Sequence, residues 1–261
     1  MSVRRITKIL LANVVPRSVY LFVNARVAAR DIASGRRWVP EIAVLPKFVR
    51  SGDTVLDVGG NHGLYTYHLS RLVGPSGRVH TFEPVPPNLG IMRHTIKTLA
   101  LNNVTVHPYG CGDKPGSAMF CVLLDHGVPQ LGWPRPQEAQ GLRFDCEIVR
   151  LDDVVDSKIG FLKIDVDGAE LLVLRGAQQI LRESRPVILF EAGGYTRDFG
   201  YEQQDVFDFL SSFGYRFFSG GCTSKTLEPR EGFTVAEDYF ALPSEVLPAG
   251  STPLDEVRAN R

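Results

Sequence analysis

The sequence predicts an α/β fold built on a doubly wound, mostly parallel sheet. Short apolar strands alternate with helical segments, the first strand runs through glycines into a helix, and acidic residues follow several strand ends. The carboxyl ends of parallel strands gather at one edge of a sheet, and open α/β sheets bind ligands there. We therefore expect the functional site at that edge.

Composition places the 261-residue chain among ordinary globular proteins. Apolar residues make up 44% of it, and 29 basic residues balance 29 acidic ones. Zero net charge gives no support for bulk attraction to nucleic acid, and no run of about twenty apolar residues predicts a membrane span. The four cysteines have no metal-ligand spacing, so we expect reduced thiols and a cytoplasmic protein.

Residues 1–50 are locally basic and predict a helical arm. Pro16 is a plausible opener of a helix that Gly35 ends, and a second short helix is expected over Glu41–Val49. We expect the arm to pack on the core with a solvated basic face. The alternative is a lid over the active site or a contact with an acidic partner.

A glycine-rich turn follows the first predicted strand. The strand carries Asp57, and the turn holds Gly59, Gly60 and Gly63. These glycines do not match the G-x-G-x-x-G spacing of dinucleotide sites, which disfavours a nicotinamide-dependent oxidoreductase. An acidic strand end followed by two glycines four residues apart suits a ligand with a cation and no pyrophosphate. A tight turn without a ligand is the alternative.

The next two strands also end in candidate binding residues. Residues 78–82 form a strand that ends at Glu83-Pro84, where a carboxylate can accept hydrogen bonds from ribose hydroxyls. The third strand, 104–108, leads to Gly112 and Asp113. Asp113 is a candidate acceptor for the amine of an adenine ring, although the same residues are also good turn formers.

Residues 125–146 are rich in glycine and proline and predict a long inserted loop. His126 and Trp133 are its residues best suited to contact a substrate. The loop is a candidate substrate lid, and the alternative is a disordered loop whose His126 and Trp133 have no role.

Two later strands end in carboxylates. Residues 159–164 lead to Asp165, and residues 185–190 lead to Glu191. Asp165 is a candidate base or cofactor-aligning group, and Glu191 is a candidate base, metal ligand or substrate contact, because clustered carboxylates raise one another's pKa. Asp167 and Glu170 have the spacing of a helix capping box.

The last elements close the sheet. A helix over 203–213 precedes a strand at 215–218, and a final strand at 238–242 returns to form an antiparallel pair. Residues 243–261 have no periodicity and predict a disordered tail.

Several ordered blocks resemble the FkbM family of S-adenosylmethionine-dependent methyltransferases. They are Gly52–Gly63, Phe82-Glu83-Pro84, Val149–Val154 and Leu162–Ala177. The resemblance runs from about Glu41 to Leu242, and Gly60, where the family commonly has Ala, is expected to be without consequence.

The resemblance implies a seven-stranded class I methyltransferase fold with one antiparallel strand, over residues 51–242. It also implies methyl transfer to a hydroxyl of a sugar or another small natural product. The expected contacts of S-adenosylmethionine are Asp57, Gly59, Gly60, Asn61, Gly63, Tyr65, Glu83, Pro84, Gly112, Asp113 and Asp165. We expect Asp165, assisted by Glu191, to orient or deprotonate the acceptor.

Two alternatives stay open. Asp165, Asp167 and Glu191 are a candidate Mg²⁺ site that would polarise a diol or sugar acceptor, although we favour transfer without a metal. A binding module that kept the fold and lost its chemistry is the more remote alternative.

Overall fold

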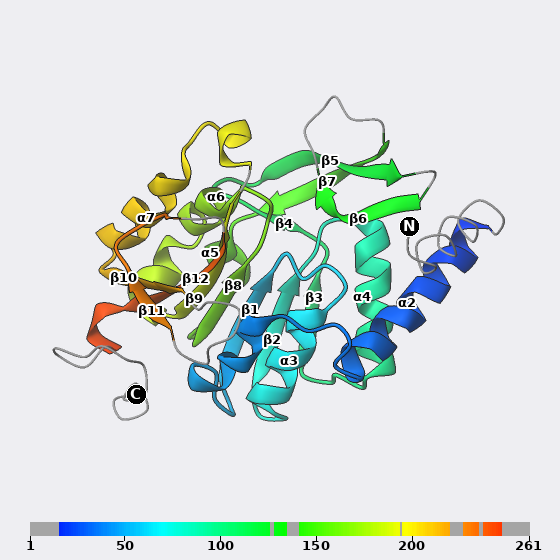
Figure 1. The fold of residues 1–261 in the computed structure, drawn as a ribbon, viewed down its shortest axis with the longest axis horizontal. Coiled ribbons are helices and arrows are strands. Elements are labelled where there is room, and N and C mark those ends of the chain that lie inside the picture. Colours follow the sequence, from blue (N-terminus) through cyan, green and yellow to red (C-terminus); the bar gives the residue numbers. More distant parts are fainter. Residues whose placement is uncertain are drawn as a thin grey trace.

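The computed structural model describes residues 16–125, 128–134, 141–193, 195–219, 227–234 and 237–246. Its main sheet has the strand order β11-β10-β12-β9-β8-β1-β2-β3 (Figure 1). The strands are β1 Thr54–Val58, β2 Arg78–Phe82, β3 Val104–His107, β8 Phe161–Ile164, β9 Val187–Ala192, β10 Tyr215–Ser219, β11 Glu228–Arg230 and β12 Glu237–Pro243.

Strand directions confirm the predicted fold class. β1, β2, β3, β8 and β9 pair in parallel, and β12 lies antiparallel to both β9 and β10. These strands with β10 form the expected seven-stranded sheet. The short β11 adds an eighth strand, antiparallel to β10.

The sheet separates two apolar cores because successive side chains of a strand point to opposite faces. In β1, Val55 packs on one side and Leu56 with Val58 on the other. The Val55 side is covered by α3 (Leu64–Val73) and short 3₁₀ turns, and Figure 1 shows α3 in front of β1 and β2. The opposite side is covered by α5 (Leu151–Val154), α6 (Glu170–Arg175) and α7 (Gln203–Ser212).

A second sheet corrects the expectation of a long loop over residues 125–146. It has the order β4-β7-β5-β6, with β4 Gly110–Cys111, β5 Gly116–Asp125, β6 Val128–Pro134 and β7 Gly141–Val149. Glycine and proline content favoured a loop, but antiparallel pairing of β7 along nearly all of β5 supplies the backbone partners. In Figure 1 this sheet lies above the carboxyl ends of β1–β3.

The described part of the N-terminal segment, from residue 16 to residue 50, contains one helix and two short turns. The helix α2 (Arg17–Ala33) begins after Pro16 as expected and packs against α4 (Pro86–Thr98). Residues 41–49, expected as one helix, form two 3₁₀ turns, η1 (Pro40–Ala43) and η2 (Leu45–Lys47). Pro46 explains the difference, because it lacks the N–H that a continuous helix needs.

The chain stays ordered for a few residues beyond β12. The 3₁₀ turn η5 (Ser244–Val246) places Glu245 against Arg185, with both pairs of atoms within 2.7 Å, and buries Val246. Residues 243–246, predicted to begin a disordered tail, are therefore ordered, and residues 247–261 lie outside the described part of the chain. In the described part of the chain, no helix combines the length and apolar content that crossing a bilayer requires.

Candidate active site

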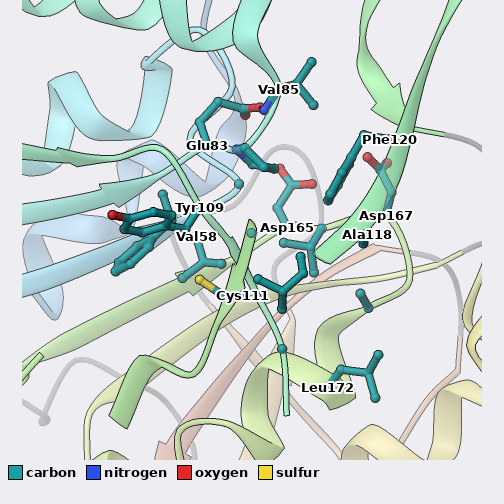
Figure 2. Close-up of a pocket in the computed structure, with 18 of the residues that line it drawn as sticks. Val58, Glu83, Val85, Tyr109, Cys111, Ala118, Phe120, Asp165, Asp167 and Leu172 are labelled. Atoms are coloured by element: carbon teal, nitrogen blue, oxygen red, sulfur yellow. The ribbon is translucent and has the colours of Figure 1, made fainter. Parts of the chain in front are cut away.

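A cavity of about 550 Å³ lies at the carboxyl ends of β1, β2 and β8, with residues of β4 and β5 in its wall. Figure 2 shows Glu83 and Val85 above Asp165, with Phe120 and Asp167 to its right. The predicted site residues that line it are Gly59, Asn61, Glu83, Pro84, Gly112, Asp113 and Asp165. The expectation that the strand ends meet in one place therefore holds for these seven.

Glu83 is held in one orientation at the end of β2. Its Oε2 accepts a hydrogen bond from Asn61 N and its Oε1 one from Val85 N, both at 2.9 Å. Only 4% of the residue is exposed. Burial raises the pKa of Glu83 to about 7, against the opposing effect of these hydrogen bonds. The carboxylate is fixed in place and close to titration at neutral pH.

The glycine turn after β1 packs directly on the end of β8. Gly59 has a φ of +79°, and a Cβ there would lie 1.8 Å from Asp165 O. Only glycine fits both the conformation and the contact. Gly59 therefore brings the turn against the backbone of Asp165.

Gly60 and Gly63 do not line the cavity. A Cβ on Gly60 would lie 2.2 Å from Thr81 Oγ1 and 2.5 Å from Met92 Cε. The departure from the family's usual Ala does not disturb the family match, and in this chain β2 and α4 occupy the space that an alanine Cβ would need. Gly60 serves packing at this position.

Asp57 faces the α3 side of the sheet and not the cavity. It is fully buried, accepts a hydrogen bond from Thr66 Oγ1 at 2.6 Å and lies 3.6 Å from Lys163 Nζ. The sequence predicted that this carboxylate faces a cation of the ligand. In the structure it faces the Lys163 cation of the chain itself.

Lys163 connects three parts of the site, and the sequence reasoning missed it. Its Nζ lies 3.0 Å from Asp165 Oδ2, donates to Gly59 O at 3.1 Å, and sits 4.9 Å from the centre of the Tyr65 ring. Burial alone lowers the pKa of Lys163, but Asp165 and Asp57 outweigh it and raise that pKa above its ordinary value. Its signal in the sequence is a single charged residue within an apolar strand.

Three carboxylates meet beside the cavity. One oxygen from each of Asp165, Asp167 and Glu191 lies within 4.8 Å of the others. Burial, followed by the charge of Asp165, raises the pKa of Asp167 to about 7 and also raises that of Glu191. Asp238, opposite Glu191 on β12, has its pKa raised to about 7, mainly by burial. The cluster can therefore hold and release protons near neutral pH.

The turn that carries Asp167 is not the capping box expected from the sequence. Gly168, with a φ of +107°, turns the chain before α6, and Ala169 is the N-cap residue. Glu170 Oε1 instead accepts hydrogen bonds from Val166 N at 3.3 Å and Gly168 N at 3.1 Å. Glu170 therefore braces the turn, which leaves the Asp167 side chain at the cavity.

The remaining wall comes from segments that carry no motif. Phe120 comes from β5, while Tyr195 and Phe199 lie at the 3₁₀ turn η4 (Thr196–Phe199). No local pattern places these residues together, because the fold alone brings the segments into contact. Of the predicted substrate contacts, Trp133 falls within β6, His126 lies outside the described residues, and Glu191 lies beside Asp165.

A comparison with known families decides which family this arrangement represents. The model of the methyltransferase FkbM domain matches residues 57–217. The chain belongs to the FkbM methyltransferase family. Asp152, which lies in the Val149–Val154 block, has a structural role in this FkbM domain. Its carboxylate accepts hydrogen bonds from Gln179 N and Ile180 N at 3.0 and 3.1 Å.

Individual relatives agree with this assignment. The chain is 29% identical to methyltransferase sdnD of Sordaria araneosa, over 53% of this chain and 64% of that protein. It is 26% identical to methyltransferase 1 of Beauveria bassiana (strain ARSEF 2860), over 47% of this chain and 57% of that protein. The chain thus spans less than two thirds of the length of these curated relatives.

A solved structure is similar in fold. It is the methyltransferase FkbM of Methylobacillus flagellatus KT, with a TM-score of 0.50 and 17% identity, covering 73% of this chain and 43% of that one. At this identity the similarity concerns the fold alone.

Proposed function

We propose that the protein transfers a methyl group from S-adenosylmethionine to a hydroxyl of a small natural product such as a sugar. The observation that supports this most is the cavity at the strand ends, which has the Glu83 carboxylate in its wall and three clustered carboxylates beside it. The Glu83 carboxylate suits the binding of a nucleoside, and the carboxylate cluster suits an acceptor that must lose a proton.

The residues present fit the methyl donor. Glu83 keeps lone pairs for ribose hydroxyls, Gly59 presents its backbone in the cavity wall, and Asp113 can accept from an adenine amine. When bound there, S-adenosylmethionine supplies a methyl group whose carbon–sulfur bond breaks as the acceptor oxygen bonds to the carbon.

Two carboxylates have separate tasks in this proposal. Asp165 is held by Lys163 at 3.0 Å, which fixes its carboxylate in place and suits it to orienting the acceptor hydroxyl. Glu191 has a raised pKa and no ion pair among the described residues, so it takes the hydroxyl proton during transfer. Alignment of acceptor and donor supplies the rest of the rate.

The charged residues of the cavity wall restrict which acceptors can bind. Glu83, Asp113, Asp165, Asp167 and Asp198 line it, and no Lys, Arg or His is found among the described lining residues. A phosphate or carboxylate on the acceptor would be repelled by the clustered carboxylates of Asp165, Asp167 and Glu191. We therefore propose an uncharged or cationic acceptor and no nucleic acid. Cys111 and Cys146 are buried and form no disulfide in the described part of the chain, in keeping with the proposed cytoplasmic location.

The test begins with calorimetric titration of S-adenosylhomocysteine into the protein and into Glu83→Ala. We expect micromolar binding that weakens at least about tenfold in the variant, because a buried charge-assisted hydrogen bond is worth about 1.5–3 kcal/mol. A folded wild-type protein that does not bind would contradict the proposal and favour a non-catalytic module.

Turnover is then measured as S-adenosylhomocysteine release with a panel of hydroxylated acceptors, each in neutral and phosphorylated form. With any acceptor that reacts, Asp165→Asn should lower kcat about 10²-fold or more and leave S-adenosylhomocysteine affinity within a few-fold. Unchanged turnover would remove Asp165 from the mechanism.

A magnesium-assisted reaction is the second candidate, favoured by the spacing of the Asp165, Asp167 and Glu191 oxygens. Lys163 already occupies one oxygen of Asp165 and would repel a cation, which supports the metal-independent route. Activity that persists after EDTA treatment is the expected result. Activity lost to EDTA and restored by Mg²⁺ would favour the metal route instead.

A further inference from the structure

Asn88 lines the cavity from the first turn of α4 and is one of its most buried polar residues. Only 3% of it is exposed. Its Nδ2 donates to Glu83 Oε1 at 3.4 Å, while its Oδ1 is buried and has no hydrogen-bond partner among the described residues.

The orientation of this amide is fixed by its neighbour. Turning it over would place the amide oxygen against the Glu83 carboxylate, and two acceptors repel at that distance. The NH₂ group must face Glu83, so the oxygen must face elsewhere. A buried carbonyl without a donor is costly, and native proteins rarely keep one without a reason.

The surroundings indicate which ligand would supply the donor. Asn61 also lines the cavity, and its Oδ1 is likewise buried without a partner among the described residues. Together with the Glu83 carboxylate, these two amide oxygens place three acceptor groups in this part of the wall. A ligand that matches it carries adjacent hydroxyl groups, as a ribose does.

We propose that Asn88 is a specificity residue for the methyl donor, and that its Oδ1 accepts a hydrogen bond from one ribose hydroxyl while Glu83 accepts from the other. This inference rests on the proposed function, because that function identifies the donor as a nucleoside. Asn88 has a second effect, since its Nδ2 helps hold Glu83 in place.

The test compares wild type with Asn88→Leu, a change of similar volume that removes both polar atoms. Each protein is titrated calorimetrically with S-adenosylhomocysteine, with its 2′-deoxy and 3′-deoxy analogues, and with S-inosylhomocysteine, which lacks the adenine amine. Asn102→Leu, at an exposed position outside the cavity lining, is the control. Circular dichroism verifies that each variant is folded.

We expect Asn88→Leu to weaken S-adenosylhomocysteine binding at least about tenfold. With the deoxy analogue that lacks the hydroxyl bound by Asn88, wild type and variant should bind within about twofold. Asn102→Leu should bind as the wild type does.

Four outcomes would overturn the inference while leaving the proposed donor in place. Equal affinity of wild type and Asn88→Leu would show that the amide oxygen takes no part in binding. A loss that persists with both deoxy analogues would show that the oxygen accepts from neither ribose hydroxyl. A loss that disappears when Asn88→Leu is made in the Glu83→Ala protein would show that Asn88 acts only by holding Glu83. A loss that disappears only with S-inosylhomocysteine would assign the oxygen to the adenine amine. A folded wild type that binds none of the probes would instead reject the proposed donor, and the inference with it.

Discussion

Asp57 and Glu83 are two carboxylates at the ends of adjacent parallel strands, and their surroundings are opposite. Asp57 points to the α3 side, where Lys163 and Thr66 contact it and no part of it is exposed. Glu83 lies one residue beyond β2, faces the cavity and is held by two backbone N–H groups and one amide. No ion pair to Glu83 is found in the described part of the chain.

The difference shows that a position at a strand end does not by itself make a carboxylate a ligand contact. The charge of Asp57 is neutralised inside the protein, so it fixes the glycine turn to β8 through Lys163. Hydrogen bonds hold Glu83 in place without an ion pair in the described structure, so its carboxylate oxygens stay available to a ligand. Four variants test this division between a stabilising and a binding carboxylate.

The largest expected effect is that of Lys163→Met on stability. It leaves Asp57 buried without its cation, and breaking a buried ion pair from one side costs about 3–5 kcal/mol. Urea denaturation measures the change in the free energy of unfolding. Lys97→Met, at an exposed position in the last turn of α4, should change it by less than about 0.5 kcal/mol.

Glu83→Ala is the matched comparison for that experiment. Because Glu83 has no ion pair to break in the described structure, its removal should cost clearly less stability than Lys163→Met. Equal losses would mean that both carboxylates serve the scaffold, and the proposed division would fail.

A smaller effect is expected from Gly60→Ala, which intrudes on the Asp57 side. The new Cβ would lie 2.2 Å from Thr81 Oγ1 and 3.5 Å from Asp57 Oδ2. Overpacking of this kind costs about 1–3 kcal/mol. Thermal unfolding checks the loss, and a second change, Thr81→Ala, should recover part of it. A fully stable Gly60→Ala protein would show that β2 and α4 move aside freely.

The smallest effect is a pH dependence of binding on the Glu83 side. A ribose hydroxyl favours the charged carboxylate, and the pKa of Glu83 is about 7, so protonation competes with the ligand below that pH. Affinity for S-adenosylhomocysteine should fall about tenfold between about pH 8 and about pH 6. Glu83→Gln should bind more weakly with little pH dependence, and an unchanged slope in that variant would assign the titration to another group.

Much of the scaffold could be predicted from the sequence because its signals are local. Alternating apolar strands and helices gave the parallel sheet, and the acidic strand ends placed Glu83 and Asp165 at one edge. These features depend on residues close together in the chain, so periodicity and turn chemistry are enough to find them.

The rest depends on contacts between distant segments. The task of Lys163 follows from its position between β1 and α3, and the strands of residues 125–146 follow from pairing with β5. The crowding at Gly60 comes from β2 and α4. No pattern within one segment indicates such contacts, so the sequence alone could not predict them.

The second sheet has a consequence for how such a protein can change over evolutionary time. It leaves the main sheet after β3 and returns before β8, and its two ends are joined by a hydrogen bond from Gly112 N to Val149 O at 2.9 Å. Between these ends it contributes Phe120 to the cavity wall and no strand to the main sheet. Substitutions in this segment can therefore change the Phe120 part of the cavity wall while every strand of the main sheet stays the same.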